Sequence, residues 1–149
     1  MQNDHVVMNL RQVVSVAGFV NTVSIQYCTL PSTAQPILWV YVIEYTGTYP
    51  YFITRSMFAI PSEQVSLTNA LQEYTLPNHR LNVSVGHYIA VGFGKTTGGS
   101  PCRAAPGDGA YTNLFGGANQ TFLASIQGSC FYYFQTQEFS IGFTTLSPV

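Results

Sequence analysis

The chain has 149 residues, of which 7% are charged and 14% aromatic, and its formal net charge is −1 at pH 7. Ordinary globular proteins contain about 25% charged residues, so this surface must consist mainly of uncharged polar residues, glycine and tyrosine. The few basic residues form no patch for phosphate, which argues against nucleic acid as a partner, and no apolar run reaches the ~18 residues of a membrane-spanning helix. At this length we expect one domain, covering residues 1–149.

Strand patterns fill the first part of the chain. Val6–Val16 alternates loosely between apolar and polar residues, and Phe19–Cys28 alternates more clearly after a turn. We expect these two strands to be antiparallel neighbours. Ile37–Tyr45 is β-branched and aromatic on both faces, which predicts a central strand. Tyr49–Phe58 contains a proline, so this strand is expected to begin at a sheet edge or at a bulge.

The clearest strand, turn and strand signal is LNVSVGHYIAVGFG, residues 81–94. Leu81–Val85 alternates with period two, and Gly86 then breaks the run. Tyr88–Phe93 is almost continuously apolar, as in a strand that is covered on both faces. This stretch therefore predicts two strands of a β domain, the second of them in its core.

The remaining stretches are less uniform. Ile60–Thr75 fits a short helical turn or a strand, and we expect a strand for part of it. Six glycines and two prolines predict a long loop over Thr96–Gly117. Strands over Phe122–Ile126, Cys130–Gln135 and Phe139–Leu146 bring the total to about eight. This pattern predicts an all-β fold, an antiparallel β-sandwich that is jelly-roll-like.

Three runs carry a family resemblance: GFVNTVSIQYC, LWVYVIEYTGTY and LPNHRLNVSVGHYIAVGF. They resemble a type of β-sandwich module found in extracellular proteins, in which a strand ending in valine meets a Gly-Asp-like turn and an apolar Ile-Gly strand. The resemblance covers about Val14–Phe93. Where that pattern often has aspartate, this chain has His87, which puts a shared role of the position in doubt. The resemblance implies a jelly-roll-like fold in a binding or structural module and implies no enzymatic activity.

Three cysteines, Cys28, Cys102 and Cys130, form an odd set. If the chain is secreted, we expect a disulfide between Cys102 and Cys130, because it would tether the glycine-rich loop to the following strand. Closing a loop of ~28 residues contributes about 3–4 kcal/mol. Cys28 is then expected to be a buried thiol, although three cysteines permit other pairings. The N-terminus lacks the regions of a signal peptide, so the chain is either a mature or trimmed extracellular form, which we favour, or not secreted.

Two sites of modification are predicted. Asn82 and Asn119 each begin an Asn-X-Ser/Thr acceptor for N-glycosylation.

Gly94-Lys95-Thr96 looks like part of a phosphate loop, but position 89 is Ile89 where that motif needs glycine. No cofactor is therefore predicted.

Metal and catalytic signals are weak. None of the three histidines has the spacing of a zinc site on one element, so we predict polar loop histidines, with His87 held beside the turn at Gly86. Glu44 and Glu138 lie at the edges of apolar strands and are the candidates for a carboxylate pair of the kind that hydrolyses glycosides. Polar strand ends explain both glutamates more simply, so we predict no catalytic residue and no metal ligand.

Aromatic residues are the richest feature. Tyr111 and Phe115 lie in the glycine-rich stretch, and Tyr132 belongs to the consecutive aromatic run at 131–134. Because a strand alternates its faces, two residues of that run point away from the core unless a second sheet or another subunit covers them. Tyrosine stacks well on sugars and on neighbouring subunits. These three residues are the predicted ligand contacts.

These observations favour a non-enzymatic extracellular structural or adhesive module that forms a homo-oligomer or polymer. An alternative is a lectin-like module that binds glycans through Tyr111 and Phe115. A further alternative is a viral or phage coat or fibre jelly roll, which predicts reduced cysteines.

Overall fold

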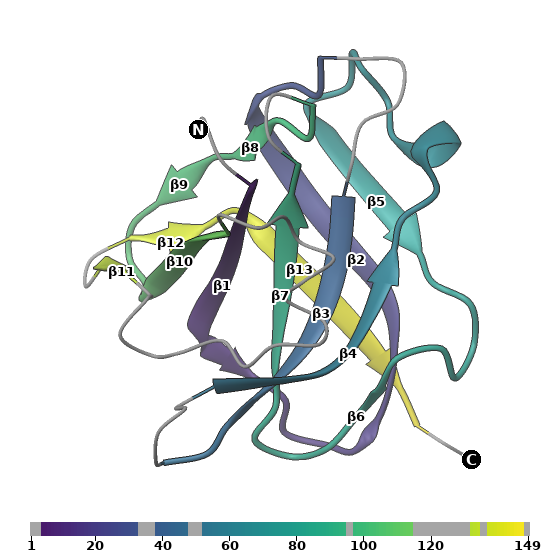
Figure 1. Cartoon of the computed structure of the whole chain (residues 1–149), viewed down its shortest axis with the longest axis vertical. Helices are drawn as coiled ribbons and strands as arrows, with labels where there is room; N and C mark the ends of the chain where they lie inside the picture. Colours follow the sequence, from purple (N-terminus) through teal and green to yellow (C-terminus); the bar gives the residue numbers. More distant parts are fainter. Residues whose placement is uncertain are drawn as a thin grey trace.

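The computed structural model describes residues 4–32, 38–47, 52–94, 97–114, 132–134 and 137–147. Within these ranges the regular structure is antiparallel strand, apart from one 3-10 turn, η1 (Ser62–Gln64). The strands form two large sheets that face each other (Figure 1). This confirms the predicted all-β antiparallel sandwich.

The first sheet contains the most apolar strands of the chain. In spatial order its six strands are β11 (Tyr132–Phe134), β10 (Gly109–Leu114), β1 (Asp4–Val13), β7 (Tyr88–Phe93), β3 (Leu38–Tyr45) and β4 (Phe52–Ala59). The strands β7 and β3 lie in the interior of the sheet, as their continuous apolar sequences predict. The strand β4 pairs with β3 and ends the sheet, as the proline before it predicts.

The second sheet is built around β2. Its members are β13 (Ile141–Leu146), β2 (Gly18–Thr29) and β5 (Leu71–Thr75), with β6 (Asn82–Val83) and β8 (Ser100–Pro101) also paired to β2. A separate pair joins β9 (Arg103–Ala104) to β12 (Glu138–Phe139). The strands β1 and β2 lie in different sheets, so the prediction that they pair is wrong. Instead β1 pairs with β10 and β7, both remote in sequence.

The predicted loop Thr96–Gly117 contains three strands, β8, β9 and β10, so this prediction is wrong for much of its length. Its glycines permit close packing. A Cβ on Gly107 would lie 2.5 Å from the Cβ of Glu138, and one on Gly109 would lie 3.0 Å from the ring of Phe139. Glycine in this stretch therefore indicates a close approach of β10 to β12 and not an open loop.

Ile60–Thr75 contains both of the predicted alternatives, since η1 is followed by β5. In the described ranges there are thirteen strands, and eight of them have five or more residues. The extra strands are pieces of two or three residues that periodicity in the sequence cannot reveal. The jelly-roll connectivity stays a prediction.

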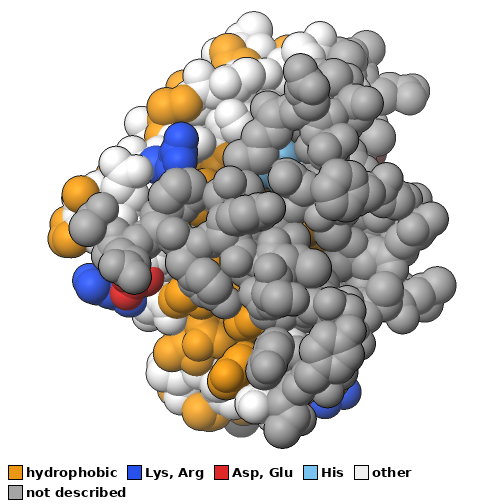
Figure 2. Space-filling view, turned by 60° about the vertical axis from the view of Figure 1, so that its left-hand side comes forward, with side chains coloured by type: hydrophobic (Ala, Val, Ile, Leu, Met, Phe, Trp, Pro, Cys, Tyr) orange, Lys and Arg blue, Asp and Glu red, His pale blue; other side chains and the backbone are white. Residues whose placement is uncertain are grey.

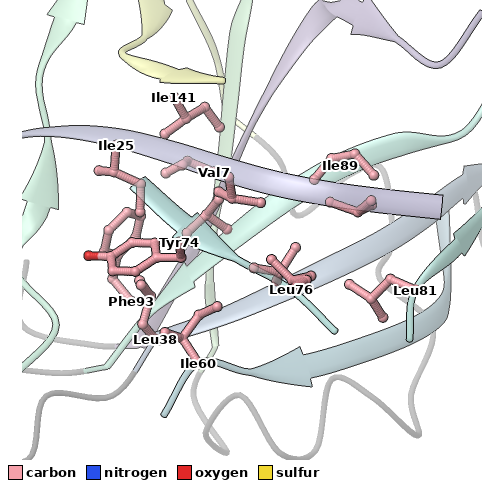
Figure 3. Close-up of a cluster of buried hydrophobic side chains, with 14 of the residues drawn as sticks. Val7, Ile25, Leu38, Ile60, Tyr74, Leu76, Leu81, Ile89, Phe93 and Ile141 are labelled. Carbon is pink, nitrogen blue, oxygen red and sulfur yellow. The ribbon is translucent and has the colours of Figure 1, made fainter. Parts of the chain in front are cut away.

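The main core lies between the two sheets, where apolar side chains of both sheets point toward one another (Figure 3). Its members include Val7, Leu38, Ile89 and Phe93 from the first sheet and Ile25, Tyr74 and Ile141 from the second. The opposite face of the first sheet carries a second cluster with Val6, Met8, Trp39, Tyr41 and Ile43. The two clusters explain why β3 is apolar at every position from 38 to 43.

A β-bulge in β4 decides which cluster each of its aromatic side chains joins. Val42 pairs with Ser56 and Ile43 pairs with Thr54, so Arg55 is an extra residue in β4. Without this bulge, Phe52 and Phe58 would share a face because they are six residues apart. With it, Phe52 joins the outer cluster and Phe58 packs against the main core.

A polar seam joins the sheets beside β1. The side-chain amide of Asn9 donates to the carbonyl of Phe139 at 2.8 Å and accepts from its N–H at 2.8 Å. Gln12 Nε2 donates to the Ile141 carbonyl at 3.3 Å. Asn9 is 2% exposed. Its amide therefore pairs with the main chain of β12 as another strand would and satisfies buried groups there.

Candidate functional site: an exposed apolar end

Seven large hydrophobic side chains are exposed in the described ranges, and five of them lie at one end of the sandwich. We call this set the apolar end; it consists of Val13, Val16, Tyr45, Val85 and Leu146. The strand registers place them together. Val13 pairs with Tyr88, Tyr88 pairs with Ile43 beside the end of β3, and Leu146 pairs with Phe19 near the start of β2.

A tight turn presents Val85 to solvent. The His87 N–H donates to the Ser84 carbonyl at 3.1 Å, and Gly86 between them has φ of +91°. That φ suits glycine at the third position of a type II turn. His87 Nδ1 accepts from the Ser84 N–H at 3.1 Å, so the turn holds this histidine as predicted. Val85 is left at the corner, 67% exposed.

The same turn also fixes the chain that carries Val16. The Gly86 N–H donates to the Val14 carbonyl at 2.9 Å, and the Val14 N–H donates to the His87 carbonyl at 2.8 Å. Val14 is thereby buried, whereas Val16, two residues later, is 66% exposed. These two hydrogen bonds link the neighbouring loops, and each loop exposes one valine to solvent.

The apolar end has little charge. In the described residues 13–18, 43–47, 84–88 and 145–147 the only carboxylate is Glu44, which forms an ion pair with Arg55. No lysine or arginine occurs in these four segments. Covering the end with another surface would therefore not strip water from an unpaired charge, which is the costly step when charged groups are buried. Figure 2, which turns the molecule by 60°, shows orange hydrophobic side chains among white uncharged atoms in its upper left and its lower half, with only small patches of charge among the described atoms.

The predicted ligand contacts lie elsewhere. The β10–β11 register pairs Tyr111 with Tyr132, so the backbone brings two of the three predicted residues together. Phe115 lies outside the described residues. Tyr111 also pairs with Val7, midway along β1 and away from the apolar end.

The predicted disulfide is wrong. Cys102 is bonded to Cys28, with their Cα atoms 4.7 Å apart. The pairing of β8 with β2 causes this, because it sets Tyr27 opposite Pro101 and the Cys102 N–H donates to the Gln26 carbonyl at 2.9 Å. Cys28 is therefore not a buried thiol, and Cys130 lies outside the described residues.

One predicted glycosylation site is accessible. Asn82 is exposed in β6, opposite Phe19, and so lies close to the apolar end. Ser84, the third residue of its Asn-X-Ser motif, begins the turn that carries Val85. Asn119 lies outside the described residues.

The other titratable candidates are separated. Glu44 is on β3 and pairs with Arg55, whereas Glu138 is on β12 in another sheet. His5 is buried within β1 and stacks on Phe93 with ring centroids 5.1 Å apart, so the prediction of a polar loop histidine is wrong at this position. His79 packs on Phe19 with ring centroids 4.4 Å apart. No group of three potential metal ligands occurs in the described part of the chain.

A buried hydrogen-bond chain between the sheets was not found from the sequence. Tyr74 Oη donates to Gln72 Oε1 at 2.7 Å, so the Tyr27 hydroxyl, 3.0 Å from Tyr74 Oη, donates to it. Burial and this hydrogen bond raise the pKa of Tyr27, and burial raises the pKa of Tyr74. Both phenols therefore stay protonated at neutral pH and stabilise the core. The sequence signals for them were the alternation in LQEYT for Gln72 and Tyr74 and the alternation in Phe19–Cys28 for Tyr27.

The chain matches no protein-family model, no curated protein and no solved structure. In the part of the chain that the structure describes, no helix is long and apolar enough to cross a membrane. The disulfide and this finding are both compatible with a secreted protein.

Proposed function

We propose that this chain is a non-enzymatic, extracellular structural or adhesive module that associates with copies of itself through the apolar end. The observation that carries the proposal is the gathering of five exposed hydrophobic side chains at one end where the described segments hold no unpaired charge. Exposed hydrophobic side chains that gather in one region, unlike single scattered ones, mark interaction sites on soluble proteins. A net charge of −1 also leaves little repulsion between copies.

The test is a double variant, Val16→Ser with Val85→Ser, studied by sedimentation velocity over a micromolar concentration range. We expect the distribution to shift to smaller species, with the dissociation constant of the end contact raised at least about tenfold, because burying one valine contributes about 1.5 kcal/mol. The matched control is Leu67→Ser with Leu71→Ser. These are the two remaining exposed hydrophobics, and the pairing of Leu71 with Gln26 places them toward the opposite end.

The control pair is expected to assemble as the wild-type protein does. A wild-type protein that stays strictly monomeric at high concentration would refute the proposal, and so would equal effects of the two double variants.

A lectin-like module is the second candidate, because Tyr111 and Tyr132 are cross-strand partners in backbone register. Tyrosine combines an apolar ring with a hydrogen-bonding hydroxyl, which suits stacking on sugar rings. A glycan array probed with the wild-type protein and with Tyr111→Ala separates the two functions. Binding that is lost in Tyr111→Ala would favour the lectin, and no binding by either protein would leave self-association as the proposal.

The viral or phage coat or fibre alternative predicts reduced cysteines, and the Cys28–Cys102 bond does not support it.

A further inference from the structure

The edge strands of the two sheets differ in how they are protected from pairing with another molecule. β4 carries a bulge at Arg55, whose guanidinium pairs with Glu44, and β5 has the exposed Glu73 at its centre. Charges and bulges are the usual devices that stop an edge strand from adding a further strand. β11 is described over Tyr132–Phe134, between residues outside the described ranges. β13, in contrast, is six residues long, IGFTTL, and contains no charge, no proline and no bulged residue.

The hydrogen bonds show which main-chain groups of β13 face away from β2. The Ile141 carbonyl accepts from Gln12 Nε2, which comes from β1 and not from β2. Alternate residues of an antiparallel strand direct their main-chain groups to the same side. The N–H and C=O groups of Phe143 and Thr145 therefore also face away from β2. Among the described residues, β13 pairs with β2 alone.

We propose that two copies of this chain pair through β13, antiparallel, about a two-fold axis at Thr144. Phe143 of each copy then faces Thr145 of the other, and each such pair exchanges both N–H···O bonds. This register leaves the Ile141 carbonyl to Gln12. An uncharged strand suits a second copy of itself because no like charges meet across the axis. The inference rests on the proposed self-association and adds a second contact to it.

The two contacts together define the form of the assembly. β13 runs toward the apolar end, where Leu146 pairs with Phe19. Antiparallel pairing of two β13 strands therefore points the two apolar ends in opposite directions. Two different two-fold contacts on one module, one through β13 and one through the apolar end, carry assembly beyond a dimer, to a closed tetramer where the two axes cross at right angles and to an open chain where they do not meet.

The test compares Thr145→Pro with Thr75→Pro by sedimentation velocity. Both changes remove one N–H from an edge of the second sheet on the side away from β2; for Thr75 this follows because the next residue, Leu76, donates its N–H to the Asn21 carbonyl of β2. Proline is tolerated at such edge positions. We expect Thr145→Pro to stop assembly at a dimer joined by the apolar ends and Thr75→Pro to assemble as the wild-type protein does. Assembly of Thr145→Pro like that of Thr75→Pro would overturn the inference.

The Val16→Ser, Val85→Ser variant separates this inference from the proposed function. If both contacts exist, that variant stops at a dimer joined by β13, and adding Thr145→Pro to it gives a monomer. A monomeric Val16→Ser, Val85→Ser variant would refute the β13 contact and leave the apolar-end contact standing. A monomeric wild-type protein would refute both.

Hydrogen exchange of the unmodified protein tests the contact without any variant. The amides of Phe143 and Thr145 are expected to exchange at least about tenfold more slowly in assembled than in dilute protein. The Glu73 and Thr75 amides on the opposite edge are expected to exchange at the same rate in both. Protection of Phe143 and Thr145 that does not depend on concentration would mean that the chain covers this edge itself, and would overturn the inference.

Discussion

The polar seam at Asn9 and the apolar end both involve β1 and the residues that follow it. At the seam the buried groups of the main chain are satisfied within the protein, whereas at the apolar end hydrophobic side chains face solvent. At the seam, a buried amide satisfies both main-chain groups of Phe139. At the apolar end, Val16 and Val85 are exposed to solvent on two loops that main-chain hydrogen bonds link to each other. The comparison indicates that stability comes from the seam and core, whereas the apolar end is available for another surface.

Loss of the Asn9 amide is expected to have the largest effect on stability. Asn9→Ala leaves the N–H and C=O of Phe139 buried without this partner, and each unsatisfied group costs about 1–3 kcal/mol. We expect the free energy of unfolding in denaturant to fall by about 3 kcal/mol. Gln12→Ala, which removes one partly buried bond of 3.3 Å, is the control and is expected to cost less than about 1 kcal/mol. Equal losses would mean that the seam does not depend on the Asn9 geometry.

Alkaline pH is expected to destabilise the core through the Tyr27–Tyr74 pair. Burial raises the pKa of both phenols above the ordinary value of 10.0. A raised pKa means that the folded protein holds these protons more tightly than the unfolded chain. The stability is therefore fully present below pH 10 and falls as the pH rises above it, by about 1.4 kcal/mol per pH unit for each proton.

Tyr27→Phe provides the control for this pH dependence. It removes one of the two buried phenols, so the slope of the unfolding free energy above pH 10 is expected to decrease by about one proton. Urea titrations at pH 9 to 11 measure it. An unchanged slope would show that the Tyr27 pKa is not responsible.

The apolar end is expected to affect stability least. Val16→Ser with Val85→Ser changes two exposed side chains, and exposed substitutions usually alter the free energy of unfolding by less than about 0.5 kcal/mol. Urea unfolding of dilute protein measures this effect apart from association. A loss as large as that of Asn9→Ala would contradict the view that these valines face solvent in the folded monomer.

Strands whose two faces are both apolar were predicted well. β3 and β7 are interior strands, and this property is local because burial on both sides leaves no polar position in the sequence. The proline before β4 likewise predicted an edge strand. The apolar end was not predicted, because the alternations of Val6–Val16 and Leu81–Val85 placed Val16 and Val85 on the apolar faces of strands. The turn signals at Ala17-Gly18 and Gly86 directly follow the exposed Val16 and Val85. They were the sequence evidence that the chain leaves the strand at these two valines.

Partners across the fold could not be predicted in the same way. The β1–β2 pairing and the Cys102–Cys130 bridge were inferred from closeness in sequence, whereas β1 pairs with β10 and Cys102 bonds Cys28, 74 residues away. The disulfide depends on where β2 and β8 meet and the β1 pairing on where β1 and β10 meet, and no local pattern encodes either contact. The positions of Tyr111 and Tyr132 opposite each other also follow only from strand register.

By itself, then, the sequence determined the fold class, the interior strands and the scarcity of surface charge, since alternation and composition are properties of neighbouring residues. The tertiary structure decided the pairing of strands, the disulfide and the gathering of exposed valines at one end. It also decided the bulge at Arg55, which sends Phe52 and Phe58 to opposite faces of β4. A one-residue shift reverses every later side chain of a strand, and only contacts with a distant partner fix that shift.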